Sequence, residues 1–89
     1  MTGKVPGNHH ASAARFFQSA IHKQVKNDLP GAIAAYLAAL RLDDTDPWVY
    51  WYLGTAYEAT GKPDKAELEF QKEQMMKKQP LGGNETVKD

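Results

Sequence analysis

The sequence repeats itself once, at an offset of 34 residues, and this repeat limits the folds that are open to it. When residues 13–46 are laid over residues 47–80, the large, small and turn-forming positions coincide. The coinciding pairs are Phe16 with Tyr50, Phe17 with Trp51, Ala20 with Gly54, Asn27 with Gly61, Ala32 with Ala66, Tyr36 with Phe70 and Leu42 with Met76. A period of this length, with two helices in each unit, is typical of solenoids built from helical hairpins. Such units stack because one hairpin cannot bury its apolar face alone, and this favours a binding module over an enzyme.

Size and composition point to one small domain without covalent or metal support. A chain of 89 residues buries only about 60–65% of the surface that its unfolded form exposes. The chain has no cysteine, so neither disulfides nor thiolate metal sites can stabilise it. Its 11 basic and 11 acidic residues give a formal net charge of zero. Because proteins that bind phosphate backbones need a basic surface, we expect no nucleic-acid partner.

The sequence also predicts no association with a membrane. No apolar run approaches the roughly 20 residues that a membrane-spanning helix needs. The first residues, Met1 to Ser12, contain one lysine and lack the apolar core of a secretory signal. A cytoplasmic location is therefore the expectation, although a domain without cysteine would also tolerate an oxidising compartment.

The expected boundaries are a disordered lead over residues 1–10, a folded domain over residues 11–79 and a disordered tail over residues 80–89. The lead is rich in Gly and Pro and poor in apolar residues. The tail begins Pro-Leu-Gly-Gly, and a proline followed by two glycines ends a helix. The first helix is expected to run from about Ala11 to Lys26, with Asn8 or Ser12 as its N-cap.

Three further helices follow from turn chemistry. Asn27 and Asp28 break the first helix, and Asp28 can cap the second. Asp46 before Pro47 is a good N-cap followed by a good first helical residue. The third helix should end at Gly61, which suits a left-handed C-cap, and Pro63 should open the fourth.

These residues together resemble the tetratricopeptide repeat. In the second repeat, the family positions are held by Tyr50, Leu53, Gly54, Tyr57, Gly61, Ala66 and Phe70. In the first repeat, the match is carried by Ala32, Tyr36, Ala39 and Leu42, while Ser19, Ala20 and Lys23 take the Leu, Gly and Tyr positions. The resemblance covers about residues 13–80. It implies an all-α fold, in which two tandem helix-turn-helix hairpins, over about 13–46 and 47–80, place four antiparallel helices in a short right-handed solenoid.

Departures from the family pattern fit polar ends of a short array. Ser19 and Lys23 would make the N-terminal face of the array more polar. Glu67, Glu73 and Gln74 would make its C-terminal face polar. The chain therefore looks like a complete array of two repeats. Because three or more repeats are usually needed for stability, self-association is an expected remedy.

The resemblance also implies where a partner would bind, because the first helix of each family repeat lines a concave groove. The implied partner-binding residues are Phe17, Ile21, Gln24 and Val25 of the first helix, and Trp48, Trp51, Thr55 and Glu58 of the third. Ala14 and Ala59 flank them. Phe17, Ile21 and Tyr52 stand where the family's basic clamp for chaperone C-terminal carboxylates has Lys and Asn, so such tails are not the expected ligand.

Two functions remain open for this groove. In one, it binds a protein or peptide partner, with Trp48 and Trp51 as anchors, since Trp is enriched among interface hot spots. In the other, two copies use the same groove to form a structural homodimer or a domain-swapped oligomer. Both tryptophans could instead pack internally, although Tyr50 already holds the family's core aromatic position.

The sequence offers no catalytic, cofactor or metal site. His9 and His10 are adjacent and cannot share a helix face, and His22 lacks an acidic residue or histidine four positions away. The turn over residues 43–46 is acidic but lacks the central Gly and terminal Glu of a calcium loop. We therefore expect a protein that is not an enzyme and that needs no cofactor.

Overall fold

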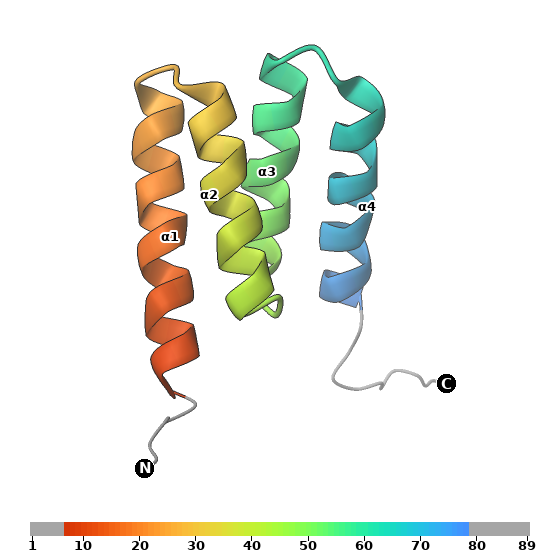
Figure 1. The fold of residues 1–89 in the computed structure, drawn as a ribbon. Coiled ribbons are helices and arrows are strands. Elements are labelled where there is room, and N and C mark those ends of the chain that lie inside the picture. Colours follow the sequence, from red (N-terminus) through yellow and green to blue (C-terminus); the bar gives the residue numbers. More distant parts are fainter. Residues whose placement is uncertain (1–6, 79–89) are drawn as a thin grey trace, which may run out of the picture.

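The computed structural model describes residues 7–78, and that part of the chain consists of four α-helices and their turns (Figure 1). The helices are α1 (Gly7–Val25), α2 (Leu29–Leu42), α3 (Pro47–Ala59) and α4 (Pro63–Lys78). Helices α1 and α2 form one antiparallel hairpin, and α3 and α4 form the other. The predicted all-α fold of two hairpins is confirmed.

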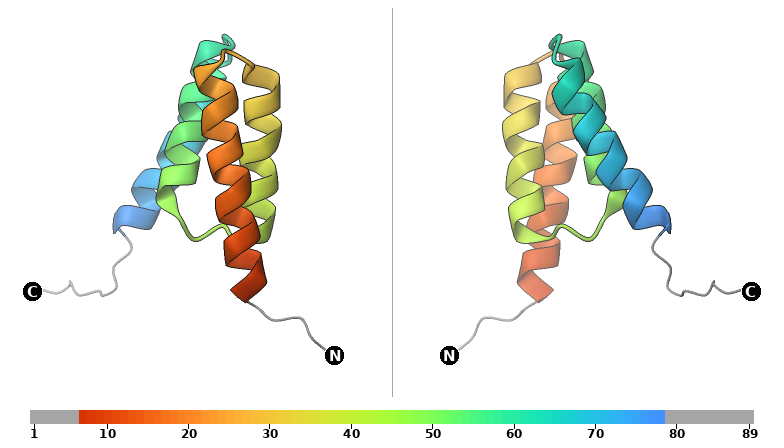
Figure 2. Two further views of the ribbon diagram at one scale, coloured as in Figure 1. Left: turned by 90° about the vertical axis from the view of Figure 1, so that its left-hand side faces the viewer. Right: turned by 90° about the vertical axis from the view of Figure 1, so that its right-hand side faces the viewer.

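The two hairpins meet through α2 and α3. Helix α1 packs on α2 and also touches α3, whereas α4 packs on α3 alone among the described helices. In the side views of Figure 2, the lower ends of α3 and α4 lean away from α2. One face of α3 is therefore left free of α2 and is bordered by α1 and by the end of α4.

The turn inside each hairpin has the same geometry. Asn27 and Gly61, which coincide in the 34-residue repeat, are the residues with left-handed φ, at 67° and 77°. The next amide in each turn donates to a carbonyl at the end of the preceding helix, Asp28 N to Lys23 O at 2.8 Å and Lys62 N to Tyr57 O at 2.9 Å. These bonds close helix ends of the Schellman type, and asparagine is the non-glycine residue that best tolerates this conformation.

The predicted N-caps of α2 and α3 are also confirmed. The Asp28 carboxylate accepts from Gly31 N at 3.1 Å, and the Asp46 carboxylate accepts from Trp48 N at 3.0 Å. Pro47 is the first residue of α3 and Pro63 the first of α4. Each cap satisfies an amide that has no partner inside its own helix.

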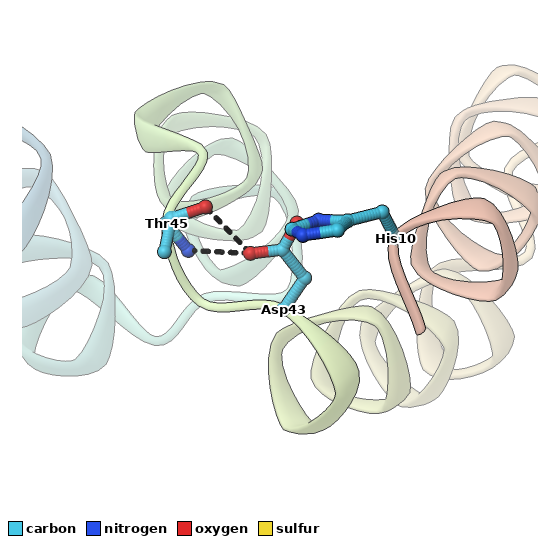
Figure 3. A network of polar contacts seen from close by, with 3 residues as sticks. All are labelled: His10, Asp43 and Thr45. Atoms are coloured by element: carbon cyan, nitrogen blue, oxygen red, sulfur yellow. Dashed lines mark hydrogen bonds and ion pairs between the residues drawn. The ribbon is translucent and has the colours of Figure 1, made fainter. Parts of the chain in front are cut away.

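Helix α1 begins earlier than predicted, at Gly7 rather than near Ala11, so Asn8 and Ser12 are helical residues and not caps. The added turn has a tertiary partner, because His10 Nδ1 lies 2.5 Å from Asp43 Oδ2 at the end of α2 (Figure 3). Residues 7–10 therefore belong to the folded domain. Residues 1–6 of the predicted lead and the predicted tail lie outside the described residues.

The core is built from small residues around two fully buried large ones, Tyr36 and Leu53. Alanines from α1, α2 and α3 fill the space between these helices, and they are Ala20, Ala32, Ala35, Ala39 and Ala56. On the other side of α3, Gly54 lets the Phe70 ring come close. A Cβ placed on Gly54 would lie 2.5 Å from the nearest ring atom of Phe70. Small side chains thus set the spacing between neighbouring helices.

One prediction about α4 is wrong. Glu73 was expected on the solvent-facing end of the array, but it is only 4% exposed, and Glu69 is only 9% exposed. Helical periodicity places both on the face that packs against α3, one turn apart. Lysines on the same helix accompany the two carboxylates, Lys72 at 3.7 Å from Glu69 and Lys77 at 2.7 Å from Glu73. Glu67 and Gln74 are exposed, as predicted.

Candidate functional site

Helices α1 and α3 together line a cavity of about 310 Å³. Its lining residues are Ile21, Gln24 and Val25 of α1 and Trp51, Tyr52 and Thr55 of α3. All except Tyr52 belong to the predicted set of partner-binding residues. The structure therefore brings five of the eight predicted residues to one cavity.

The other three predicted residues lie outside its lining. Phe17 is half-buried and packs its ring against Tyr52 at 5.5 Å between centroids. Trp48 lies beside Trp51 at 6.1 Å and extends the apolar surface beyond the cavity. The Glu58 side chain is exposed near the end of α3 and takes part in no side-chain hydrogen bond or salt bridge found among residues 7–78, although its carbonyl accepts from Gly61 N at 3.0 Å.

Tyr52 is the centre of the aromatic cluster at this site. Its ring centroid lies 5.2 Å from Trp51, 6.2 Å from Tyr36 and 6.5 Å from Trp48. The Trp51 contact is edge-on, an arrangement that aromatic quadrupoles favour. We call Phe17, Trp48, Trp51 and Tyr52 the aromatic surface. The fully buried Tyr36 lies beneath it, so the surface is anchored in the core.

Both tryptophans remain accessible. Trp48 is 55% exposed and Trp51 is 39% exposed, while Val25 at the far side of the cavity is 78% exposed. Each indole ring contacts neighbouring aromatic rings, and more than a third of each tryptophan stays exposed. Over residues 7–78, neither tryptophan is packed internally.

A chain of hydrogen bonds crosses three helices beneath the cavity. The Tyr36 hydroxyl donates to Gln24 Oε1 at 2.6 Å, and Gln24 Nε2 donates to Thr55 Oγ1 at 3.0 Å. The Thr55 hydroxyl donates to the Tyr52 carbonyl at 2.7 Å. The Gln24 amide and the Thr55 hydroxyl are thus bonded within the chain, and these hydrogen bonds fix the position of the cavity wall. Burial raises the pKa of Tyr36 to about 12, so its hydroxyl stays a neutral donor near neutral pH.

The end of α4 adds a positive charge to the edge of the aromatic surface. Lys77 Nζ lies 5.8 Å from the centroid of the Trp48 ring, within the range of a cation–π contact. The same nitrogen is 2.7 Å from Glu73. Sequence reasoning missed both Lys77 and Tyr52 at this site. Tyr52 was within reach of a periodicity argument, because it follows Trp48 by four residues and so shares its helix face.

The acidic turn after α2 uses its side chains locally (Figure 3). Asp43 Oδ1 accepts from the Thr45 amide at 3.0 Å and from the Thr45 hydroxyl at 2.5 Å. The hydrogen bond from the Thr45 hydroxyl, followed by the contact with His10 and then the bond from the Thr45 amide, holds the pKa of Asp43 below its ordinary value. Over residues 7–78 the structure places no three His, Cys, Asp or Glu side chains together as a metal site would.

Comparison with known proteins identifies the repeat. A family model described as TPR repeat matches residues 26–61, which span α2, α3 and the turns around them. The match therefore covers the second half of the first hairpin and the first half of the second. Neither the curated proteins nor the solved structures gave a match to the chain.

The match over residues 26–61 and the two equivalent hairpins confirm the predicted resemblance to the tetratricopeptide repeat, and the four described helices are consistent with two repeats. Repeats of this family generally mediate protein–protein interaction and are not catalytic. None of the four described helices combines the length and apolar character needed to cross a membrane.

Proposed function

We propose that this chain binds a protein or peptide partner through the aromatic surface and the adjoining cavity. The observation that carries the proposal is the exposure of Trp48 and Trp51 beside a cavity, at 55% and 39%, while Tyr52 and Phe17 hold the cluster in place. Rigid aromatic groups that are accessible before binding make effective anchors, because little side-chain freedom is lost on association.

The chemistry of this surface favours an apolar segment of the partner. Phe17, Ile21 and Tyr52 provide ring and aliphatic contacts where a carboxylate clamp would need cationic and amide groups. The polar groups of Gln24 and Thr55 are already bonded to one another. A short extended segment or one face of a helix, carrying one or two large apolar side chains, fits such a site.

The test is a selection of peptide ligands from a display library on the full chain, followed by binding measurements on variants. Trp51→Ala should weaken a selected peptide by about 2 kcal/mol, roughly 30-fold, and leave far-UV helicity nearly unchanged. Leu68→Ala is the matched control, because Leu68 is also exposed (56%) but lies on α4. Equal losses in both variants, or loss of helicity in Trp51→Ala, would contradict the proposal.

A second function is a homodimer in which two copies cover the aromatic surface. It is favoured by the same exposed apolar groups, which soluble domains commonly bury in an interface. It predicts a molar mass of two chains by light scattering and a Tm that rises with protein concentration. A monomeric mass at all concentrations would instead leave the surface free for another partner.

A further inference from the structure

We propose that a second copy of this chain stacks head to tail on the first, with α1 of one copy lying antiparallel on the outer face of α4 of the other. The contact between copies repeats the packing of α2 on α3 inside one copy. Because two different faces meet, the interface is heterologous, and each stacked copy leaves one face open for the next. The inference does not rest on the proposed function, because the aromatic surface takes no part in this contact.

Helices α1 and α4 are the two end helices of the array (Figure 1). Inside the array, the packing of α2 on α3 forms the junction between the two hairpins. Among the described helices, α4 packs on α3 alone, and α1 packs on α2 with a smaller contact to α3. The outer face of each end helix is therefore not covered by another helix of residues 7–78.

The outer face of α4 carries a hollow whose lining is equivalent to part of α2. The hollow has a volume of about 540 Å³ and is lined by Glu67, Phe70, Gln71, Gln74 and Met75. At the offset of 34 residues, these positions correspond to Ile33, Tyr36, Leu37, Leu40 and Arg41 of α2. Ile33 and Leu40 pack against the core cluster that α2 and α3 share. This face of α4 is thus the equivalent of the face that α2 turns to its neighbour.

The outer face of α1 is equivalent, in the same way, to a face of α3. A hollow of about 310 Å³ on α1 is lined by Ser12, Arg15, Phe16 and Ser19, and a second hollow beside it adds Gln18 and His22. At the same offset, Arg15, Ser19 and His22 correspond to Val49, Leu53 and Ala56 of α3. These α3 residues are buried in the cluster that includes α2, whereas Arg15 and His22 are exposed. The two outer faces are therefore the two halves of a junction that the chain already forms once.

The charges of the two faces are complementary in this arrangement. Neighbouring helices of the array run antiparallel (Figure 1), so stacking places the start of α4 beside the end of α1. The start of α4 brings the exposed carboxylates of Asp64 and Glu67. Helix α1 contains no acidic residue, and a hollow at its end is lined by Ser19, His22, Lys23, Lys26 and Asp28, of which Asp28 is the N-cap of α2. The acidic start of α4 thus meets the basic end of α1.

Two exposed apolar side chains lie at matching distances from these charges. Met75 follows Glu67 by eight residues, which is about 12 Å along α4, and Met75 is 66% exposed. Phe16 precedes Lys23 and Lys26 by seven and ten residues, about 10 and 15 Å along α1, and Phe16 is 43% exposed. Antiparallel stacking can therefore pair the charges and the apolar groups at the same time, and both apolar side chains lose contact with water.

Polar replacements make this contact weaker than the junction inside the chain. Gln71 and Gln74 of α4 stand where α2 has Leu37 and Leu40. Less apolar area is therefore buried between copies than between α2 and α3, and exposed charges supply more of the attraction. Association consequently depends on protein concentration and weakens as salt is added.

The test measures the molar mass of the full chain by light scattering over a range of protein and salt concentrations. The wild-type mass should rise with protein concentration beyond that of two copies and fall when salt is added. Lys26→Glu and Glu67→Lys each reverse one charge of the contact and should weaken self-association about 5- to 10-fold. Lys65→Glu is the matched control and should leave the mass unchanged, because exposed Lys65 lies over the Tyr57 ring and not in the outer hollow.

The double variant Lys26→Glu/Glu67→Lys restores opposite charges and should recover self-association, with the same far-UV helicity in every chain. A wild-type chain that stays monomeric, or a double variant as weak as the single ones, would overturn the inference. A mass that stops at two copies and ignores both single reversals would also overturn it, because the aromatic surface would then be the interface. Trp51→Ala should leave stacking unchanged, so the failure of stacking and the failure of the proposed function are separate results.

Discussion

The two hairpins share their backbone geometry but differ in what they bury. Ala35 and Ala39 of α2 coincide in the repeat with Glu69 and Glu73 of α4, and all four residues are buried. Burial is therefore set by position on the hairpin and not by the residue that occupies it. In the first hairpin this position is satisfied by alanine, and in the second by carboxylates with lysine partners.

The two hairpins also differ at the contact between a small residue on the first helix and an aromatic residue on the second. Ala20 and Tyr36 of the first hairpin correspond to Gly54 and Phe70 of the second. The first hairpin accommodates a methyl group on α1 and anchors its aromatic residue through the hydroxyl. In the second hairpin Phe70 comes so close to α3 that no Cβ fits on Gly54. The second hairpin is thus the more tightly constrained at this contact.

The largest effect should come from making the second hairpin resemble the first at this contact. Gly54→Ala places a Cβ 2.5 Å from a Phe70 ring atom, so the ring or the helix must move. We expect the free energy of unfolding to fall by about 1–3 kcal/mol, measured by urea denaturation. Partial recovery in the double variant Gly54→Ala/Phe70→Leu would show that the ring is the obstacle. A Gly54→Ala variant as stable as wild type would show instead that the two hairpins are equally permissive.

The next effect concerns the buried carboxylate Glu73. Lys77→Met leaves this carboxylate, which is 4% exposed, without its partner, and should lower stability by about 1–2 kcal/mol. The estimate is reduced because Lys77 itself is more than half exposed. Glu73→Met removes the buried charge while keeping the volume, so it should change stability by less than about 1 kcal/mol. Thermal and urea denaturation of both variants would reveal this asymmetry, and a larger loss in Glu73→Met would refute it.

The turns and helix caps could be predicted from the sequence, because they depend on interactions between residues that are close together in the chain. Asn27 and Gly61 set the hairpin turns, and Asp28 and Asp46 cap the helices that follow, because each acts within a few residues of itself. The family resemblance, carried over position by position, named five of the six residues that line the cavity. These features depend on spacing along the chain, which the sequence displays directly.

The failures concern contacts between distant parts of the chain. Glu73 was predicted to be exposed because the end faces of a repeat array are polar, but its burial depends on how α4 packs against α3. Helix α1 begins early, with an added turn that touches Asp43, 33 residues away from His10. The bonding of Gln24 to Tyr36 and Thr55 likewise requires three helices to be placed first. Tyr52 was missed as a site residue. In the sequence it was interpreted only as a replacement for a clamp residue, which argues against binding of chaperone C-terminal carboxylates.

A smaller effect is expected from converting the buried tyrosine of the first hairpin into the phenylalanine of the second. Tyr36→Phe removes the hydroxyl that donates to Gln24 and should lower stability at neutral pH by about 0.5–1.5 kcal/mol. The pKa of Tyr36 is raised by burial from 10.0 to about 12, so the folded chain holds this proton more tightly than the unfolded chain.

The sign of the pH effect follows from that difference. The contribution of Tyr36 is complete below about pH 10 and is lost as the pH rises through about 12, with a limit of about 2–3 kcal/mol. Urea denaturation between pH 9 and pH 11 should therefore show a steeper loss for wild type than for Tyr36→Phe. Parallel curves would indicate that the folded chain ionises this hydroxyl as readily as the unfolded chain does.

The smallest effect should come from the contact that ties α1 to the turn between the hairpins. His10 is largely exposed, and exposed ion pairs contribute little, so His10→Ala should lower stability by at most about 0.5 kcal/mol. The pKa of Asp43 is lowered chiefly by the Thr45 hydroxyl, so its contribution is present above pH 3.8 and is lost as the pH falls through the lower folded-state pKa. Asp43→Asn should flatten the acid limb of the stability curve. Because the Thr45 hydroxyl is the largest single cause of the lowered pKa, Thr45→Val should reproduce the change better than His10→Ala. The opposite order would assign the turn's stability to its contact with α1.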